Sequence, residues 1–200
     1  TRRGARHLGL GRLGAGDVAE LLGALLGSPP APELVASVVE RSDGNPLFVE
    51  ELAAGLADDP GAPMPPHLRD AVVSRVERMP IGAAAVLRTC AVGGREVEHD
   101  LLAEMVGAGD TDPGALDRDL RTCVESGLLV ADQRRGTYQF RHALVHEAVL
   151  ADVLPGELHR LHRACATALA EHQRSTPGVG ADQWWSRLAR HWAGAGDFDA

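Results

Sequence analysis

The residues best suited to ligand chemistry lie in the polar segment 42–46. Gly44 stands where a helix that ends near Arg41 needs a residue tolerant of positive φ. Asn45 can cap a second helix, and Pro46 suits its first position because no N–H is missed there. Free N–H groups at such a helix start can receive an anion or the polar edge of a ligand. The segment therefore predicts a sharp helix–helix corner, which is either a well-capped junction or a ligand contact.

A second group consists of Arg141 and His142, which follow a predicted β-hairpin and open a predicted helix. The guanidinium, the helix start and a protonatable ring all favour negative charge, although a helix-capping histidine explains the same pattern. His142 and His146 have the i, i+4 spacing of a zinc-binding helix, but an HExxH motif fails at Leu150 and no third ligand is near. We therefore predict no metal site, and we expect His162 on the surface of an amphipathic helix.

The composition argues against several classes of site. None of the 20 basic residues is lysine, so the chain cannot itself complete a Walker-type phosphate loop or form a Schiff base. The formal net charge of −8 argues against a general nucleic-acid surface. Three scattered cysteines indicate reduced thiols in a cytoplasmic protein. Without a signal peptide, an apolar run of roughly 18 residues or a catalytic signature, we expect neither membrane association nor an enzyme.

Apolar spacing predicts a mainly α-helical chain with one β-hairpin. Hydrophobic residues make up 44% of the chain and aromatic residues only 4%, a core of Leu, Val and Ala that favours helices. Periodicity and breaker residues predict helices over 17–26, 33–41, 46–56, 67–79, 81–92, 98–106, 115–126, 143–154, 157–173 and 182–194. Residues 128–131 and 137–140 flank a polar, glycine-containing turn and predict the hairpin.

Breaks rich in proline and glycine divide the chain into three expected domains. Residues 1–62 form a small three-helix bundle that ends in a polar linker. Residues 63–155 show helices, a hairpin and a further helix, the order typical of a winged-helix domain. Residues 156–200 hold two amphipathic helices that resemble the start of a helical repeat array. Both ends look arbitrary, so we expect a segment excised from a longer protein.

Several motifs, in order, resemble the STAND-class NTPases, and most closely the large ATP-binding transcriptional regulators of the LuxR type. They are residues 41–52, which resemble the "GNP" motif of the helical lid, and residues 68–76, 140–149, 158–166 and 191–197. The resemblance covers nearly the whole chain. It implies that residues 1–62 are the helical lid of an NTPase module. Residues 63–155 would be its winged helix, and 156–200 the first helices of a TPR-like array.

The resemblance also implies a function. In that family a P-loop core binds ATP, the lid and winged helix close over it, and a C-terminal helix-turn-helix binds DNA. This segment would then be a non-catalytic regulatory arm that couples the nucleotide state of the P-loop core to effector domains of the same chain. Gly44, Asn45 and Pro46 would abut the nucleotide, and His142 with Arg141 would sense its phosphates. The parent protein, rather than this segment, would bind ATP or ADP, and it would reach DNA only through its C-terminal domain.

Two alternatives stay open. The segment could be a nucleotide-independent winged-helix module for protein interaction or DNA binding, with Arg134 and Arg135 as its basic pair. Acidic residues along helix 115–126 argue against the DNA version, because they would repel phosphate. The same arm could instead belong to a cyclase- or kinase-linked ATPase, and nothing in these residues discriminates that.

Overall fold

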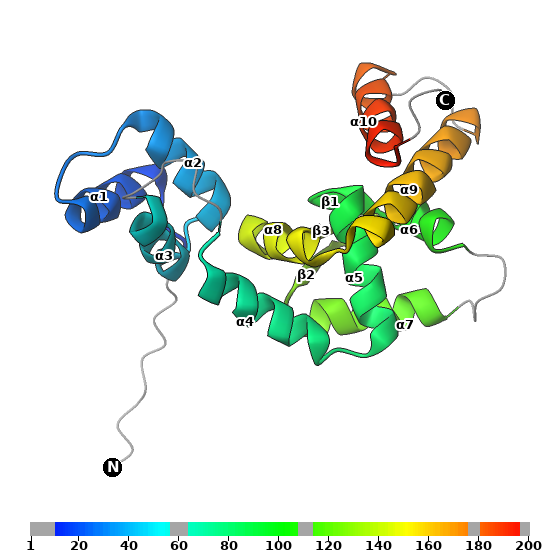
Figure 1. Ribbon diagram of the computed structural model, residues 1–200, viewed down its shortest axis with the longest axis horizontal. Helices are drawn as coiled ribbons and strands as arrows, with labels where there is room; N and C mark the ends of the chain where they lie inside the picture. The colour runs from blue at the N-terminus through cyan, green and yellow to red at the C-terminus, as the bar shows by residue number, and fades with distance from the viewer. Residues whose placement is uncertain (1–10, 57–63, 108–113, 176–180, 197–200) are drawn as a thin grey trace, which may run out of the picture. The chain divides into compact units, whose positions relative to one another are not determined.

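The computed structural model describes residues 11–56, 64–107, 114–175 and 181–196 (Figure 1). The predicted linkers within 58–63, 108–113 and 176–180 lie outside these residues. The chain divides into two compact units, Thr1–Pro65 and Pro66–Ala200, and each is described here by itself. The described residues are mainly helical, as predicted, with one small three-stranded sheet. None of the helices in these ranges is both long and apolar enough to cross a bilayer.

The described part of the first unit is a bundle of three helices. They are α1 (Ala15–Leu26), α2 (Pro32–Ser42) and α3 (Pro46–Leu56). Their shared core consists of apolar side chains that recur at helical spacing: Val18, Leu22, Val38, Val49, Leu52 and Ala53. Pro32 and Pro46 stand at the first position of α2 and α3, where the missing N–H costs no hydrogen bond. Each helix contacts the other two.

The second unit is built around one alanine-rich helix. Its helices are α4 (Pro66–Glu77), α5 (Ile81–Gly93), α6 (His99–Val106), α7 (Ala115–Glu125), α8 (Ala143–Asp152), α9 (Pro155–Ser175) and α10 (Ala181–Gly194). Nine residues of α5 are buried. Small side chains on α5 leave room for α6, α7, α8 and α9 to contact it from different sides. The predicted helices are correct to within a few residues at each end.

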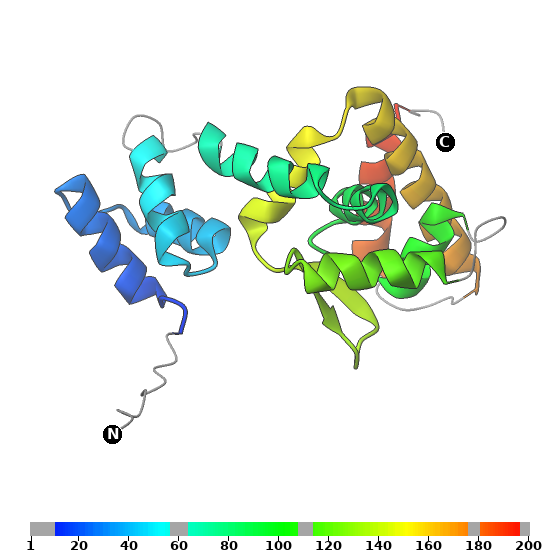
Figure 2. The ribbon, with the colours of Figure 1, turned by 90° about the horizontal axis from the view of Figure 1, so that it is seen from below.

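The sheet contains the predicted hairpin and one strand that the sequence pattern missed. The hairpin strands β2 (Leu129–Asp132) and β3 (Thr137–Phe140) are antiparallel and project beyond the helices (Figure 2). Strand β1 (Glu96–Glu98) adds to the other edge of β3, giving the order β1-β3-β2. Val97 is the one buried residue of β1 and faces the core. A three-residue strand carries too short an alternation to be recognised, so the prediction of a hairpin alone was incomplete.

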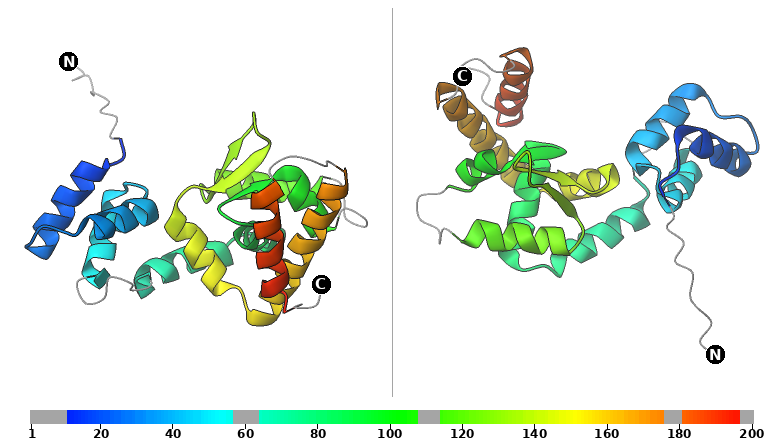
Figure 3. Two further views of the ribbon diagram at one scale, coloured as in Figure 1. Left: turned by 90° about the horizontal axis from the view of Figure 1, so that it is seen from above. Right: turned by 180° about the vertical axis from the view of Figure 1, so that it is seen from behind.

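Helices α9 and α10 share the core of this unit. Cys165, Ala166 and Leu169 of α9 and Leu188 of α10 belong to the same cluster of buried apolar residues as α5 and α6. The two helices lie against each other, and α9 also contacts α6 (Figure 3, left). The predicted boundaries after residues 62 and 155 stay predictions.

Candidate functional site

The corner between α2 and α3 has the predicted local geometry. Gly44 has φ of 67°, and the residue before it, Asp43, also has a left-handed backbone with φ of 53°. Asn45 caps α3 with its Oδ1, which accepts a hydrogen bond from the Leu47 N–H at 3.1 Å, and Pro46 is the first helical residue. The corner is therefore a capped helix junction in which a second residue, unlike the single glycine expected, turns left-handed.

Residues 12 and 13 tie an earlier part of the chain to this corner. The Leu13 N–H donates to the Gly44 carbonyl at 2.9 Å. Arg12 forms an ion pair with the Asp43 carboxylate and also donates to its carbonyl at 3.0 Å. A Cβ on Gly44 would lie 2.4 Å from the Leu13 carbonyl oxygen, far inside van der Waals contact. Residue 44 must therefore be glycine for space as well as for φ, and only the second reason was predicted from the sequence.

The exposed residues that begin α3 are apolar, whereas free N–H groups were expected there; the partly exposed Arg12–Asp43 ion pair adds charge to the same corner. The Leu47 N–H is engaged by Asn45 Oδ1, and the Val49 N–H donates to the Asn45 carbonyl at 3.0 Å. Pro46 is exposed and Leu47 is 54% exposed, while Gly44 is buried. Such a surface suits contact with a flat apolar face, such as a nucleobase or a sugar, better than it suits a phosphate.

Arg141 follows β3 and is hydrogen-bonded to the segment between α7 and β2. Its backbone N–H donates to the Leu128 carbonyl at 3.0 Å, and its Nε donates to the Gly127 carbonyl, also at 3.0 Å. Arg75 donates to the neighbouring Ser126 carbonyl. Ser126 is the C-cap of α7 and Gly127 follows it, and because the helix dipole favours positive charge there, both arginines stabilise this end of the helix. The guanidinium predicted to meet an anion is thus already engaged at Nε.

His142 is the N-cap residue of α8, with an extended backbone at φ of −138° and ψ of 142°. Its side chain makes no capping hydrogen bond. The alternative of a helix-capping histidine is therefore correct about where His142 stands, but not about a capping role for its ring. One turn later, His146 Nε2 donates to the Ala91 carbonyl at 2.9 Å, and its ring lies edge-on to Phe140. Burial lowers the pKa of His146. Because its Nε2 is committed to a carbonyl, His146 links α8 to α5.

The five predicted site residues fall in separate units, Gly44, Asn45 and Pro46 in the first and Arg141 and His142 in the second. Within the described ranges, no group of three histidine, cysteine or acidic side chains is placed to hold a metal ion.

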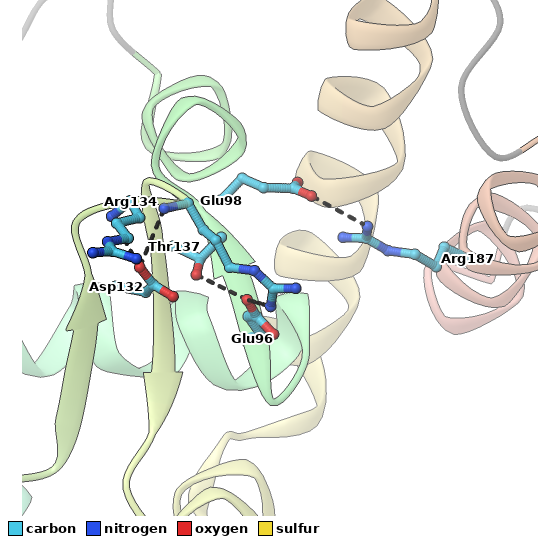
Figure 4. A network of polar contacts seen from close by, with 7 residues as sticks. Glu96, Glu98, Asp132, Arg134, Thr137 and Arg187 are labelled. Atoms are coloured by element: carbon cyan, nitrogen blue, oxygen red, sulfur yellow. Dashed lines mark hydrogen bonds and ion pairs between the residues drawn. The ribbon is translucent and has the colours of Figure 1, made fainter.

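The basic pair on the hairpin turn is largely balanced by acidic groups (Figure 4). Asp132 Oδ1 accepts hydrogen bonds from the backbone N–H groups of Arg134 and Arg135 at 2.9 and 3.2 Å. The Arg135 guanidinium lies 3.4 Å from Glu96 on β1, and Thr137 donates to the same carboxylate oxygen at 2.8 Å. This end of the sheet therefore presents little net positive charge.

The exposed charged residues of α7 also balance one another. Two are acidic, Asp117 and Glu125, and two are basic, Arg118 and Arg121. A surface that binds the DNA backbone needs several uncompensated cations. Neither the hairpin nor α7 provides them.

A buried polar cluster between α9 and α10 escaped the sequence analysis. His191 is fully buried, and its Nδ1 lies 2.9 Å from Nδ1 of His162, which is therefore not the surface residue that was expected. Arg190 Nη2 lies 3.2 Å, and Cys165 Sγ 3.5 Å, from Nε2 of His191. The burial of His191 could have been predicted from its position one turn after the apolar Leu188, since both lie on one stripe of α10.

The chemistry open to this cluster is limited. Burial raises the pKa of the Cys165 thiol to about 11, so the sulfur is protonated at neutral pH and is a poor nucleophile. His162 and Cys165 face opposite nitrogens of the His191 ring, so no single ion can bind all three. The cluster is suited to hydrogen bonding and proton exchange only.

Comparison with known proteins identifies one long relative of unknown function. No family model matches the chain. The chain is similar to "Uncharacterized protein R02095" of Rhizobium meliloti (strain 1021), with 28% identity over 155 residues that cover 71% of this chain. The aligned segment is 15% of that protein, so the chain spans a small part of the length of this curated relative.

Proposed function

We propose that this segment is the non-catalytic regulatory arm of an ATP-dependent, LuxR-type transcriptional regulator of the STAND class. It would couple the nucleotide state of a P-loop core to effector domains of the same cytoplasmic chain. The observation that carries the proposal is the α2–α3 corner, in which a left-handed Gly44, a capping Asn45 and an N-terminal Pro46 form one rigid junction.

The corner is suited to transmit movement as well as to contact a ligand. Arg12 and Leu13 bind Asp43 and Gly44 through an ion pair and backbone hydrogen bonds. A displacement of the chain at residue 12 would therefore reach the two residues that lead into the cap of α3. A nucleotide regulates such an arm only through contacts that differ between two arrangements. Exposed Pro46 and Leu47 would supply the contact with the base or sugar.

The topology of the second unit supports its assignment as a winged helix. A short strand lies between α5 and α6, α7 precedes the hairpin, and the strands take the order β1-β3-β2. The pair α9 and α10 supports the start of a TPR-like array, because each presents one apolar stripe to the other. Similarity to a protein of which the chain spans only 15% supports a place within a larger multidomain protein.

The balanced charges of the hairpin and α7 favour this function over the DNA-binding alternative. A winged helix can serve as a packing module, since a fold does not define a function. DNA would then be bound by another domain of the parent protein. A cyclase- or kinase-linked ATPase with the same arm remains the second candidate.

Nucleotide exchange in the parent protein tests the proposal. We expect Pro46→Ala and His142→Ala to change the release rate of a fluorescent ADP analogue by about tenfold, the effect of losing one good contact. Pro155→Ala is the matched control for Pro46, because Pro155 is likewise exposed at the first position of a helix. The isolated 200-residue chain should bind ATP and ADP negligibly. Unchanged release in both variants would refute the assignment of the corner and of His142.

A further inference from the structure

The contact between α9 and α10 has a polar centre within an apolar surround. Leu188 of α10 packs among the buried residues of α9, and His191 lies one turn further along the same face. A Cβ on Gly194 would lie 2.7 Å from the His162 ring, so this glycine is what lets the ring lie flat against α10. Residues of both helices therefore shape the contact between the two imidazoles.

The hydrogen-bond partners define the protonation of both rings. A guanidinium can only donate, so Arg190 Nη2 must donate to His191 Nε2 at 3.2 Å. The proton of His191 then lies on Nδ1 and is donated to His162 Nδ1 at 2.9 Å. His162 accepts this bond and keeps its own proton on Nε2. Both rings are neutral in this arrangement, and each facing nitrogen has a suitable partner.

A further proton on either ring breaks this arrangement. Added to His191 Nε2, it would point an N–H at the Arg190 guanidinium. Added to His162 Nδ1, it would set two N–H groups against each other across 2.9 Å. In the first case two donors of α10 would repel each other beside a buried charge, and in the second the hydrogen bond that joins α9 to α10 would become repulsive.

The surrounding charges oppose protonation as well. Arg190 and Arg187 on α10, and His159 on α9, face the pair and lower the two pKa values. On β1, Glu98 lies 3.9 Å from the Arg187 guanidinium, which partly offsets its charge (Figure 4). Burial is the largest cause for both rings, and together with these charges it lowers the pKa of His191 from 6.5 to about 3.

We propose that the His162–His191 pair makes the docking of α10 on α9 proton-sensitive. With both rings neutral the helices are docked, and as the pH falls through the range in which a free histidine titrates, the equilibrium shifts toward a released α10. The function is independent of nucleotide binding and would give this part of the chain a response to acid. It belongs to the class of histidine-based interface switches.

The direction and size of the effect follow from linkage. Because the docked pKa of His191 is lower than the released one, the released state binds more protons, and docking is lost as the pH falls below 6.5. With pKa values of 6.5 released and about 3 docked, His191 alone reduces the docking equilibrium constant about 25-fold between about pH 7 and about pH 5. His162, whose pKa is also lowered, adds to this change.

All three tryptophans of the chain lie on α10. Trp184 and Trp192 pack partly buried against the core and report the release of the helix, whereas Trp185 is 61% exposed and adds a constant background. The test is a titration of the 200-residue chain from about pH 7.5 to about pH 5, with acrylamide quenching of tryptophan fluorescence and far-ultraviolet circular dichroism followed together. We expect quenching to rise toward acid while most of the helical signal is retained. Quenching that does not change overturns the proposal. A parallel loss of the helical signal also overturns it, because acid would then unfold the whole unit.

Variants identify the responsible rings. The double variant His162→Asn with His191→Asn places amides, which do not titrate in this range, at both positions, and we expect its quenching to be independent of pH. His172→Gln is the matched control, because His172 is an exposed histidine of the same helix, and it should titrate like the original chain. A double variant that is folded at neutral pH yet keeps the original transition refutes the proposal. If it does not fold, His162→Asn alone is titrated in its place, and a transition identical to that of the original chain refutes the proposal.

Discussion

Replacing Gly44 by alanine should lower the free energy of unfolding of the first unit by more than the left-handed backbone conformation alone explains. An alanine at φ of 67° costs about 1 kcal/mol, since a Cβ crowds the backbone in the left-handed region. The same Cβ would also lie 2.4 Å from the Leu13 carbonyl oxygen, a rigid backbone atom. The corner must then move, and the Leu13–Gly44 hydrogen bond, worth about 1 kcal/mol, is lost. Together with the strain of moving the corner, we expect Gly44→Ala to lower the free energy of unfolding by about 3 kcal/mol in total.

Gly27 offers a control that separates these two costs. It ends α1 with φ of 70°, and a Cβ there would meet nothing within 4 Å. Gly27→Ala should therefore cost only the backbone term of about 1 kcal/mol. The difference of about 2 kcal/mol between the two variants isolates the contact with Leu13.

Hydrogen exchange measured by mass spectrometry resolves the effect by region. Peptides from α1, α2 and α3 should exchange faster in Gly44→Ala, by about 100-fold if they open together as one unit. Peptides from the second unit should keep their rates, because the substituted residue lies in the first. Equal acceleration in the Gly27→Ala and Gly44→Ala variants would show that the Leu13 contact contributes nothing, and the reasoning would be wrong.

Two further predictions concern buried thiols and exposed charges. Burial raises the pKa of all three thiols: that of Cys123 to about 12, that of Cys165 to about 11, and that of Cys90 as well. None of them should therefore react with a disulfide reagent at about pH 8 until denaturant is added. Rapid reaction of any one in the native protein would contradict its burial. Glu96→Gln should lower the free energy of unfolding in urea by only about 0.5 kcal/mol, since its pair with Arg135 is solvent-exposed. A loss above about 2 kcal/mol would mean that the hairpin depends on this carboxylate.

Features that depend on a few consecutive residues were predictable from the sequence. The capping Asn45 and the N-terminal Pro46 act within one turn of the helix that they begin. The β2–β3 hairpin was likewise predicted, because its turn and both strands lie within a dozen residues. Helix positions followed from apolar spacing for the same reason: the buried stripe of a helix repeats every three or four residues.

Features that join distant segments were not predictable. Strand β1 pairs with β3, and Val97 lies opposite Tyr138, about forty residues along the chain. The contact of residues 12 and 13 with the corner was missed for the same reason, because Arg12 and Asp43 are 31 residues apart.

The sequence alone determined that the chain is mainly helical, where its helices begin and end, and that residues 42–46 form a capped corner. Only the tertiary structure decided that the Leu13 backbone packs against Gly44 and that the His162 and His191 rings are in hydrogen-bond contact. The physical reason is the range of the interactions. Capping and periodicity act within one element, whereas the neighbours of a side chain depend on which faces of separate elements pack together.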